Sequence, residues 1–84
     1  MQEKEIGRIT HYYGHLSVGI IELNDALSVG DTIHIKGHSA DFSQSVDHLE
    51  IEHATVPEAK AGDVVGIKVL QKIHPNDKVY KQTA

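Results

Sequence analysis

The stretch LSVGDTIHIK, residues 27–36, combines a turn signal with an alternating segment. Gly30 and Asp31 form the turn signal, and the residues from Thr32 to Lys36 then alternate between polar and apolar. This alternation is typical of a strand with one face in a core and the other in water. The stretch therefore predicts a tight turn that leads into a half-buried strand.

The same pattern recurs further along the chain. A second copy, AGDVVGIK, occupies residues 61–68, and a weaker version, NDKVYK, occupies residues 76–81. The recurrence predicts a small β structure built around one repeated turn-and-strand unit.

Length and composition indicate one globular domain. A chain of 84 residues has too little surface to bury for a second core. Its 39% apolar and 24% charged residues are ordinary for a folded protein. We expect a single domain over residues 1–84, with a core from about 4 to 81.

The whole chain reads as short strands separated by turns. Expected strands occupy residues 4–13, 16–23, 32–36, 42–53, 63–70 and 78–80, with fraying from 81 to 84. Gly19 predicts a bulge or a close approach of another backbone. The fourth strand changes its apolar parity, which predicts a bulge near Asp47 or His48. Pro57 predicts a turn or a single helical turn over residues 56–60.

These elements predict an all-β fold, a small closed β-barrel of six strands with Greek-key connections. Closure would also remove exposed strand edges. The expected core consists of Ile9, Val18, Ile20, Leu27, Ile33, Ile35, Val46, Leu49, Ile51, Val65, Ile67, Val69 and Val79.

Charge and cysteine content restrict the function classes. The formal charge of −4 gives no global positive field for a polyanion, so nucleic-acid binding would require a local patch. The absence of cysteine excludes disulfides and thiolate metal sites. No signal segment or membrane-spanning run is present, and we expect a soluble cytoplasmic protein.

Several motifs together resemble a known family. They are Gly7-Arg8-Ile9, the stretch from Leu27 to Ile33, Val46 to Ile51, and the stretch from Ala59 to Ile67. This succession is similar to the second domain of translational GTPases such as elongation factor Tu. Residues 6–12 and 31–38 look closer still to the C-terminal barrel of collagenase-like peptidase-family proteins and to free-standing elongation factor-like proteins.

The resemblance implies a binding platform instead of an enzyme. In translational GTPases this barrel contacts tRNA or ribosomal RNA, and in the peptidase-like proteins it is an appendage beside the catalytic part. No phosphate-loop spacing occurs among the glycines of this chain. The resemblance carries no specific contact residues, because the matching motifs are structural turns.

Aromatic and basic residues suggest a contact surface. The candidate RNA or partner contacts are Arg8, His11, Tyr12, Tyr13, His15, Lys36 and His38. Rings at a hairpin tip can stack on unpaired bases, and Arg8 and Lys36 could contact phosphates. The alternative is that the tyrosines cover the barrel wall and the histidines are ordinary surface residues.

Metal binding and catalysis have weaker signals. If the third and fourth strands pair, the set His34, Lys36 and His38 could approach the set His48, Glu50 and Glu52, but no local zinc signature is present. The hydroxyls of Ser17, Ser28, Ser39, Ser43 and Ser45 lie outside any nucleophile motif. We expect no cofactor, no resident metal and no enzymatic activity. The acidic stripe of Asp47, Glu50, Glu52 and Glu58 could receive a basic protein partner.

The leading hypothesis is a non-catalytic module that contacts tRNA, ribosomal RNA or the translation or RNA-modification machinery, including a ribosome-associated protein. The alternative is a protein-interaction adaptor that docks onto a larger enzyme. Neither hypothesis includes a membrane or a small-molecule substrate.

Overall fold

The computed structural model describes residues 2–38 and 40–83, whose backbone forms ten strands. The first five are β1 (Gln2–Tyr13), β2 (Val18–Leu23), β3 (Leu27–Ser28), β4 (Thr32–Lys36) and β5 (Asp41–Ser45). The other five are β6 (Leu49–Ile51), β7 (Ala54–Val56), β8 (Glu58–Ala59), β9 (Val64–Lys68) and β10 (Lys78–Thr83). No helix occurs in the described residues, so the all-β class is confirmed. The predicted domain also included Met1, Ser39 and Ala84, which lie outside the described residues.

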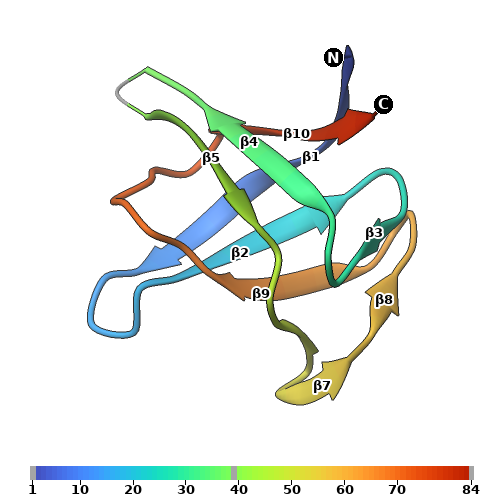
Figure 1. Cartoon of the computed structure of the whole chain (residues 1–84). Coiled ribbons are helices and arrows are strands. Elements are labelled where there is room, and N and C mark those ends of the chain that lie inside the picture. Colours follow the sequence, from blue (N-terminus) through green and yellow to red (C-terminus); the bar gives the residue numbers. More distant parts are fainter. Residues whose placement is uncertain (1, 39, 84) are drawn as a thin grey trace.

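The strands form one large curved sheet and one short pair (Figure 1). The large sheet has eight strands in the order β5-β4-β10-β1-β2-β9-β6-β7, and β3 pairs with β8. Neighbouring strands are antiparallel throughout. The prediction of a closed six-stranded barrel is therefore wrong, because the sheet ends at β5 and β7 and contains more strands.

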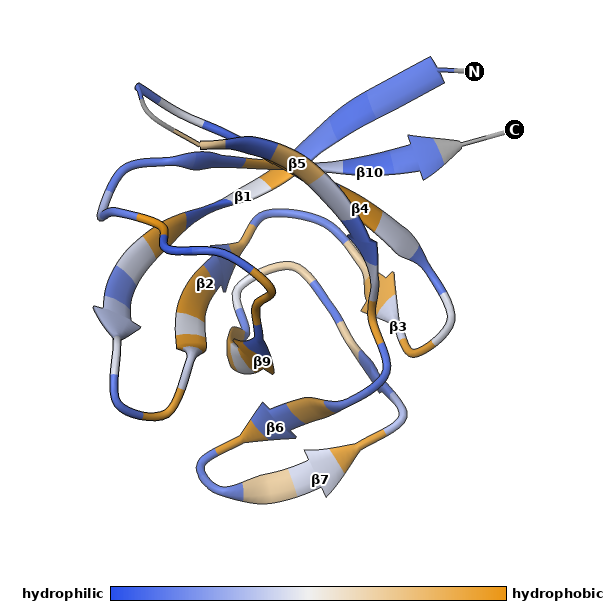
Figure 2. Cartoon of the chain, turned by 60° about the vertical axis from the view of Figure 1, so that its left-hand side comes forward, coloured by the Kyte–Doolittle hydropathy of each residue, from blue (hydrophilic) through white to orange (hydrophobic). Residues whose placement is uncertain are grey.

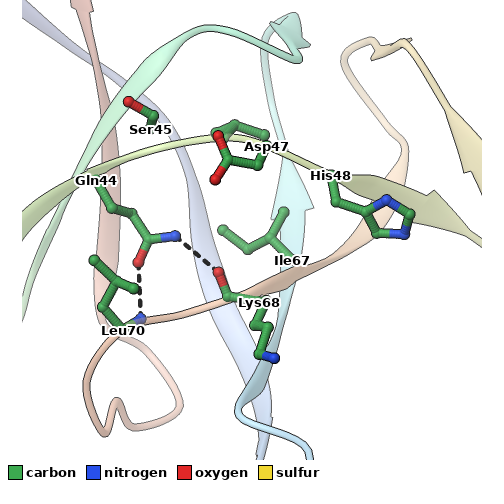
Figure 3. A pocket seen from close by; sticks show the side chains of 8 residues that line it. Gln44, Ser45, Asp47, His48, Ile67, Lys68 and Leu70 are labelled. Atoms are coloured by element: carbon green, nitrogen blue, oxygen red, sulfur yellow. Dashed lines mark hydrogen bonds between the residues drawn. The ribbon is translucent and has the colours of Figure 1, made fainter.

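A side chain joins β5 to β9 where backbone pairing is missing. The Gln44 amide donates from Nε2 to the carbonyl of Lys68 at 2.8 Å, and its Oε1 accepts from the N–H of Leu70 at 2.9 Å (Figure 3). A primary amide offers one donor and one acceptor side, as a peptide group does. Gln44 therefore links the two strands across a hollow of about 260 Å³.

The predicted turn-and-strand unit occurs three times, as expected. In each turn an aspartate Oδ2 accepts from the backbone N–H three residues earlier, at 2.8 to 3.0 Å. The pairs are Ser28 with Asp31, Lys60 with Asp63, and His74 with Asp77. The residue before each aspartate has positive φ: Gly30 at 98°, Gly62 at 92° and Asn76 at 75°. Positive φ at this turn position favours glycine or asparagine, which explains the G-D and N-D sequences.

The segment predicted as one strand over residues 42–53 is divided. Val46 is buried and bonds through its N–H to the carbonyl of Asp31 at 2.8 Å, while its own carbonyl accepts from Gly30 at 2.8 Å. Val46 and Leu49 are three positions apart, so in one continuous strand they would point to opposite faces. Because both are buried, the strand must be interrupted between them. The predicted single bulge is therefore a three-residue interruption between β5 and β6.

Two further local expectations differ from the structure. Pro57 lies in a bend between the short strands β7 and β8, which agrees with the expected turn at this residue and not with a helical turn, and its carbonyl accepts from the N–H of Val29 at 3.0 Å. The expected fraying after Tyr80 does not occur through Thr83, because β10 continues to pair with β1 up to Gln2. Figure 1 shows the start of β1 beside the end of β10.

The core is apolar and lies inside the curved sheet. Its members are Ile6, Ile9, Ile21, Leu23, Leu27, Ile33, Ile35, Ala40, Val46, Leu49, Ala59, Val65, Ile67, Val69, Ile73 and Val79. The predicted core residues Val18, Ile20 and Ile51 are only half-buried.

Strand β2 has the opposite parity to the prediction: Gly19, Ile21 and Leu23 face the core. A Cβ on Gly19 would approach Cδ1 of Ile73 to 2.6 Å. The predicted bulge or close backbone approach at Gly19 is therefore wrong, because the close neighbour is the Ile73 side chain and the pairing of Gly19 is regular.

Candidate functional site

An open groove of about 540 Å³ lies on the outer face of β2 and β9. Val18, Ile20 and Gly66 form its floor, because Ile20 pairs directly with Gly66 across the two strands. The tip of the β1–β2 hairpin, with Tyr13 and Leu16, forms one wall. We call this feature the outer groove.

The outer groove concentrates exposed apolar side chains. Tyr13 is 50% exposed, Leu16 65% and Val64 49%, and all three line it. Figure 2 shows hydrophobic colour along most of β2, which matches the presence of apolar residues on both of its faces. A strand that is apolar on both faces is typical of a sheet covered on both sides. The described residues cover only the inner side.

The β6–β7 hairpin forms the second wall and carries the charge. Glu50, Glu52 and His53 all line the groove. Figure 2 places this hairpin below β2 and β9. Glu50 accepts from His48 Nε2 at 2.8 Å, whereas Glu52 has no hydrogen bond or ion pair within residues 2–38 and 40–83. The wall therefore presents at least one carboxylate with no counter-charge.

The predicted contact residues at the hairpin tip divide between two environments. His11 and Tyr13 line the outer groove, with their rings in an edge-on contact at 6.3 Å between centroids. Tyr12 points the other way and packs, half-buried, against the core. His15 is exposed in the turn that follows β1.

The predicted basic contacts lie on another part of the sheet. Arg8, Lys78 and Lys36 are direct cross-strand neighbours on β1, β10 and β4. Acidic groups lie beside two of these cations, since Glu22 is 3.8 Å from Arg8 and Glu5 is 3.7 Å from Lys78. The remaining predicted contact, His38, is exposed in the loop after β4.

His34 joins three strands through ionic hydrogen bonds. Its Nδ1 donates to the Glu3 carboxylate at 2.8 Å and its Nε2 donates to Asp41. The bond to Asp41 raises the pKa of His34 above its ordinary value of 6.5, and Glu3 adds to this against the opposing effect of partial burial. The same contact lowers the pKa of Asp41 below 3.8. Both ring nitrogens donate a hydrogen bond to a carboxylate, so His34, Glu3 and Asp41 form an ionic cluster that we call the His34 clasp.

The metal hypothesis required β4 to lie beside the strand that carries His48. In the structure β4 pairs with β5 and β10, while β6 pairs with β7 and β9, so the two candidate ligand sets are not on paired strands. Among the residues that the structure describes, no group of three or more acidic or histidine side chains could hold a metal ion. The acidic stripe is also divided, because Asp47 lines the other hollow and Glu58 lies on β8.

The serines considered for catalysis are dispersed. Ser17 lies in the β1–β2 turn, Ser28 in β3, and Ser43 and Ser45 in β5. Ser39 lies outside the described residues.

Sequence reasoning missed the groove floor. Val18 and Ile20 were assigned to the core, and Leu16, Val64 and Gly66 were given no role. A signal was present, because β2 carries branched apolar residues at both parities (Val18 and Ile20 on one, Ile21 and Leu23 on the other).

Known proteins are similar to this chain in sequence, and others are similar in fold. The chain is 39% identical over 77 residues to a protein named an uncharacterised protease from Methanocaldococcus jannaschii, covering 90% of this chain and 19% of the relative. It is 32% identical over 82 residues to a collagenase from Porphyromonas gingivalis, covering 95% of this chain and 23% of that relative. The chain thus spans about a fifth of the length of the curated relatives it matches. No protein-family model matches the chain.

A solved structure with the same fold is the C-terminal domain of a protein described as a U32 peptidase from Geobacillus thermoleovorans. The TM-score is 0.89 at 17% identity, over 95% of this chain and 93% of that domain. These findings support the collagenase-like part of the resemblance, while the likeness to elongation factor Tu is not confirmed. The secondary structure of residues 2–38 and 40–83 contains nothing of the length and apolarity that a membrane-crossing helix requires.

Proposed function

We propose that this chain is a non-catalytic accessory domain that docks onto the larger part of a collagenase-like protease, in the same or another polypeptide. The outer groove is the docking surface. The observation that carries the proposal is the apolar lining of the outer groove, where Tyr13 and Leu16 of the hairpin tip and Val64 of β9 are about half exposed or more. Contiguous exposed apolar surface of this kind marks interaction sites.

The similar proteins support this proposal. Each curated relative is four to five times longer than the region it shares with this chain, so in those proteins the region has a large neighbour. An accessory domain of such a protein needs one face for its own core and one for its neighbour. Strand β2 has this two-sided apolar character, and Val64 continues its apolar outer face onto β9.

A docking titration tests the proposal. The Methanocaldococcus jannaschii protease is prepared without the segment that matches this chain, and the chain is titrated into it in a calorimeter. We expect saturable binding that Leu16→Gln weakens by about tenfold, because the glutamine places a polar amide in an apolar contact. The relative's own matching segment serves as the positive control.

The chain offers a matched control in Leu70→Gln. Leu70 is 75% exposed and lies outside the outer groove, so this variant makes the same chemical change elsewhere. Equal binding of both variants would refute docking through the groove. Binding of the relative's own segment but not of this chain would refute the proposed function.

RNA binding is a second candidate, supported by the cross-strand row of Arg8, Lys78 and Lys36. Like charges placed directly opposite each other are unfavourable, and Glu22, Glu5 and Asp41 already lie beside these cations, so phosphate groups would add to an existing compensation. A gel-shift assay with tRNA at low salt tests it. A salt-sensitive complex weakened by Arg8→Ala would support RNA binding, and the absence of any shift would remove this candidate.

A further inference from the structure

Two positions in the outer groove carry residues that the fold itself does not favour. The first is Gly66, in the middle of β9. Glycine in a strand interior costs about 0.5 to 1 kcal/mol relative to alanine. Its φ is not in the positive region, and a Cβ built there would meet Ile20 Cδ1 at 3.5 Å and Val18 Cγ1 at 3.7 Å, which are ordinary contacts. The fold therefore gives no reason for glycine at this position.

The absence of a side chain at Gly66 shapes the groove. Gly66 lies between Ile20 of β2 and Glu50 of β6, to both of which it is paired. A glycine in a strand often marks a place where a ligand or another chain approaches closely. The missing side chain leaves a notch in the apolar floor.

The second position is the turn between β6 and β7. Glu52 and His53 have φ of 50° and 66°, so both central residues of this two-residue hairpin turn are left-handed. Such turns favour Asn-Gly, Asp-Gly and Gly-Gly, because these residues adopt this conformation more readily than most. Glutamate is disfavoured there. Backbone strain of this kind concentrates at binding sites.

Both exceptions line the same groove. Resting on the proposed docking function, we infer that the outer groove binds an extended segment of the partner protein, which places an apolar side chain in the Gly66 notch and a lysine or arginine against Glu52. The notch fits hydrocarbon because Val18 and Ile20 flank it. The cation complements a carboxylate that has no partner in the described residues.

Selection from a random displayed peptide library tests the inference without knowledge of the partner. We expect wild-type protein to enrich peptides that carry an apolar residue and a nearby lysine or arginine. Gly66→Val should weaken their binding by about tenfold, since a filled notch excludes roughly one to two methylene groups. Glu52→Lys should reverse the charge preference of the selected peptides.

Folding of the variants is measured separately. Gly66→Ala serves as the milder version, because its Cβ makes only ordinary contacts. The paired change Glu52→Asn with His53→Gly should raise the melting temperature, because it relieves the backbone strain of the turn. It should also weaken the binding of the selected peptides, because it removes the Glu52 carboxylate.

The outcomes separate the inference from the docking function. Enrichment of acidic peptides, equal binding by Gly66→Val, or no enrichment at all would overturn the inference. The titration with the protease is independent of the peptide selection. If the chain docks onto the protease but enriches no peptide, the proposed function stands. Only the inference that the groove binds an extended segment is then refuted.

Discussion

The two faces of β2 carry the same kinds of residue but have different environments. Ile21 and Leu23 on the inner face are 0% and 2% exposed. Val18 and Ile20 on the outer face are half-buried on the floor of an open groove. Burial of apolar side chains is favourable on either face, so the two faces differ in exposure because other residues cover only the inner one. The inner face stabilises the fold, and the outer face is available for a partner.

The largest expected effect is the loss of stability caused by truncating a side chain on the inner face of β2. Ile21→Ala should lower the free energy of unfolding by about 2 to 5 kcal/mol, because it leaves a cavity in a closely packed core. Ile20→Ala should cost clearly less, since solvent already reaches that side chain. Urea unfolding of both variants measures the difference. Equal losses would contradict the assignment of separate roles to the two faces.

A pair of glycines provides a second comparison, with effects of opposite sign. Gly19→Ala should destabilise the fold by about 1 kcal/mol or more, because its Cβ would force the buried Ile73 side chain to move. Gly66→Ala should stabilise it by about 0.4 to 1 kcal/mol, since it restricts the unfolded chain at a compatible position.

Thermal unfolding of both alanine variants measures these changes. A loss of stability in Gly66→Ala would mean that the fold itself requires this glycine, and the notch would then need no partner to explain it.

The smallest expected effect concerns the His34 clasp, which lies away from the groove. The pKa of His34 is raised in the folded protein, so its contribution is full below about pH 6.5 and is lost as the pH rises through the folded value. The pKa of Asp41 is lowered, so its contribution is present above pH 3.8 and is lost as the pH falls through the folded value. The clasp therefore stabilises most at mildly acidic pH.

His34→Gln should lower the melting temperature at mildly acidic pH, and it should remove the declines that the clasp produces as the pH rises above about 6.5 or falls below about 3.8. The effect should be modest, because solvent screens the exposed Asp41 carboxylate. His15→Gln, a change at an exposed turn residue, is the control. An unchanged pH profile in His34→Gln would show that the clasp contributes nothing to stability.

Local chemistry explains which parts of the fold could be predicted from the sequence. Each aspartate turn is specified within four residues, by one positive-φ position and one carboxylate that bonds to the backbone. The strand from Thr32 to Lys36 was also predicted with its correct bounds and buried face. Its polar and apolar residues alternate strictly, so only one face can be buried.

The outer groove could not be predicted because its parts depend on distant contacts. The apolar residues at both parities of β2 do not show which of its faces is buried. That is decided by contacts such as the one between Gly19 and Ile73, more than fifty positions away. The second wall exists because Val46 bonds to the turn at Asp31, which separates β6 from β5. No pattern within β5 or β6 contains that information.

The most direct measurement is the ratio of docking affinities of Leu16→Gln and Leu70→Gln for the Methanocaldococcus jannaschii protease without its matching segment. Both leucines are largely exposed, so neither change should alter stability appreciably. If the chain docks through the outer groove, Leu70→Gln should bind about ten times more tightly than Leu16→Gln. A ratio near one, with both variants folded and the positive control binding, would contradict it.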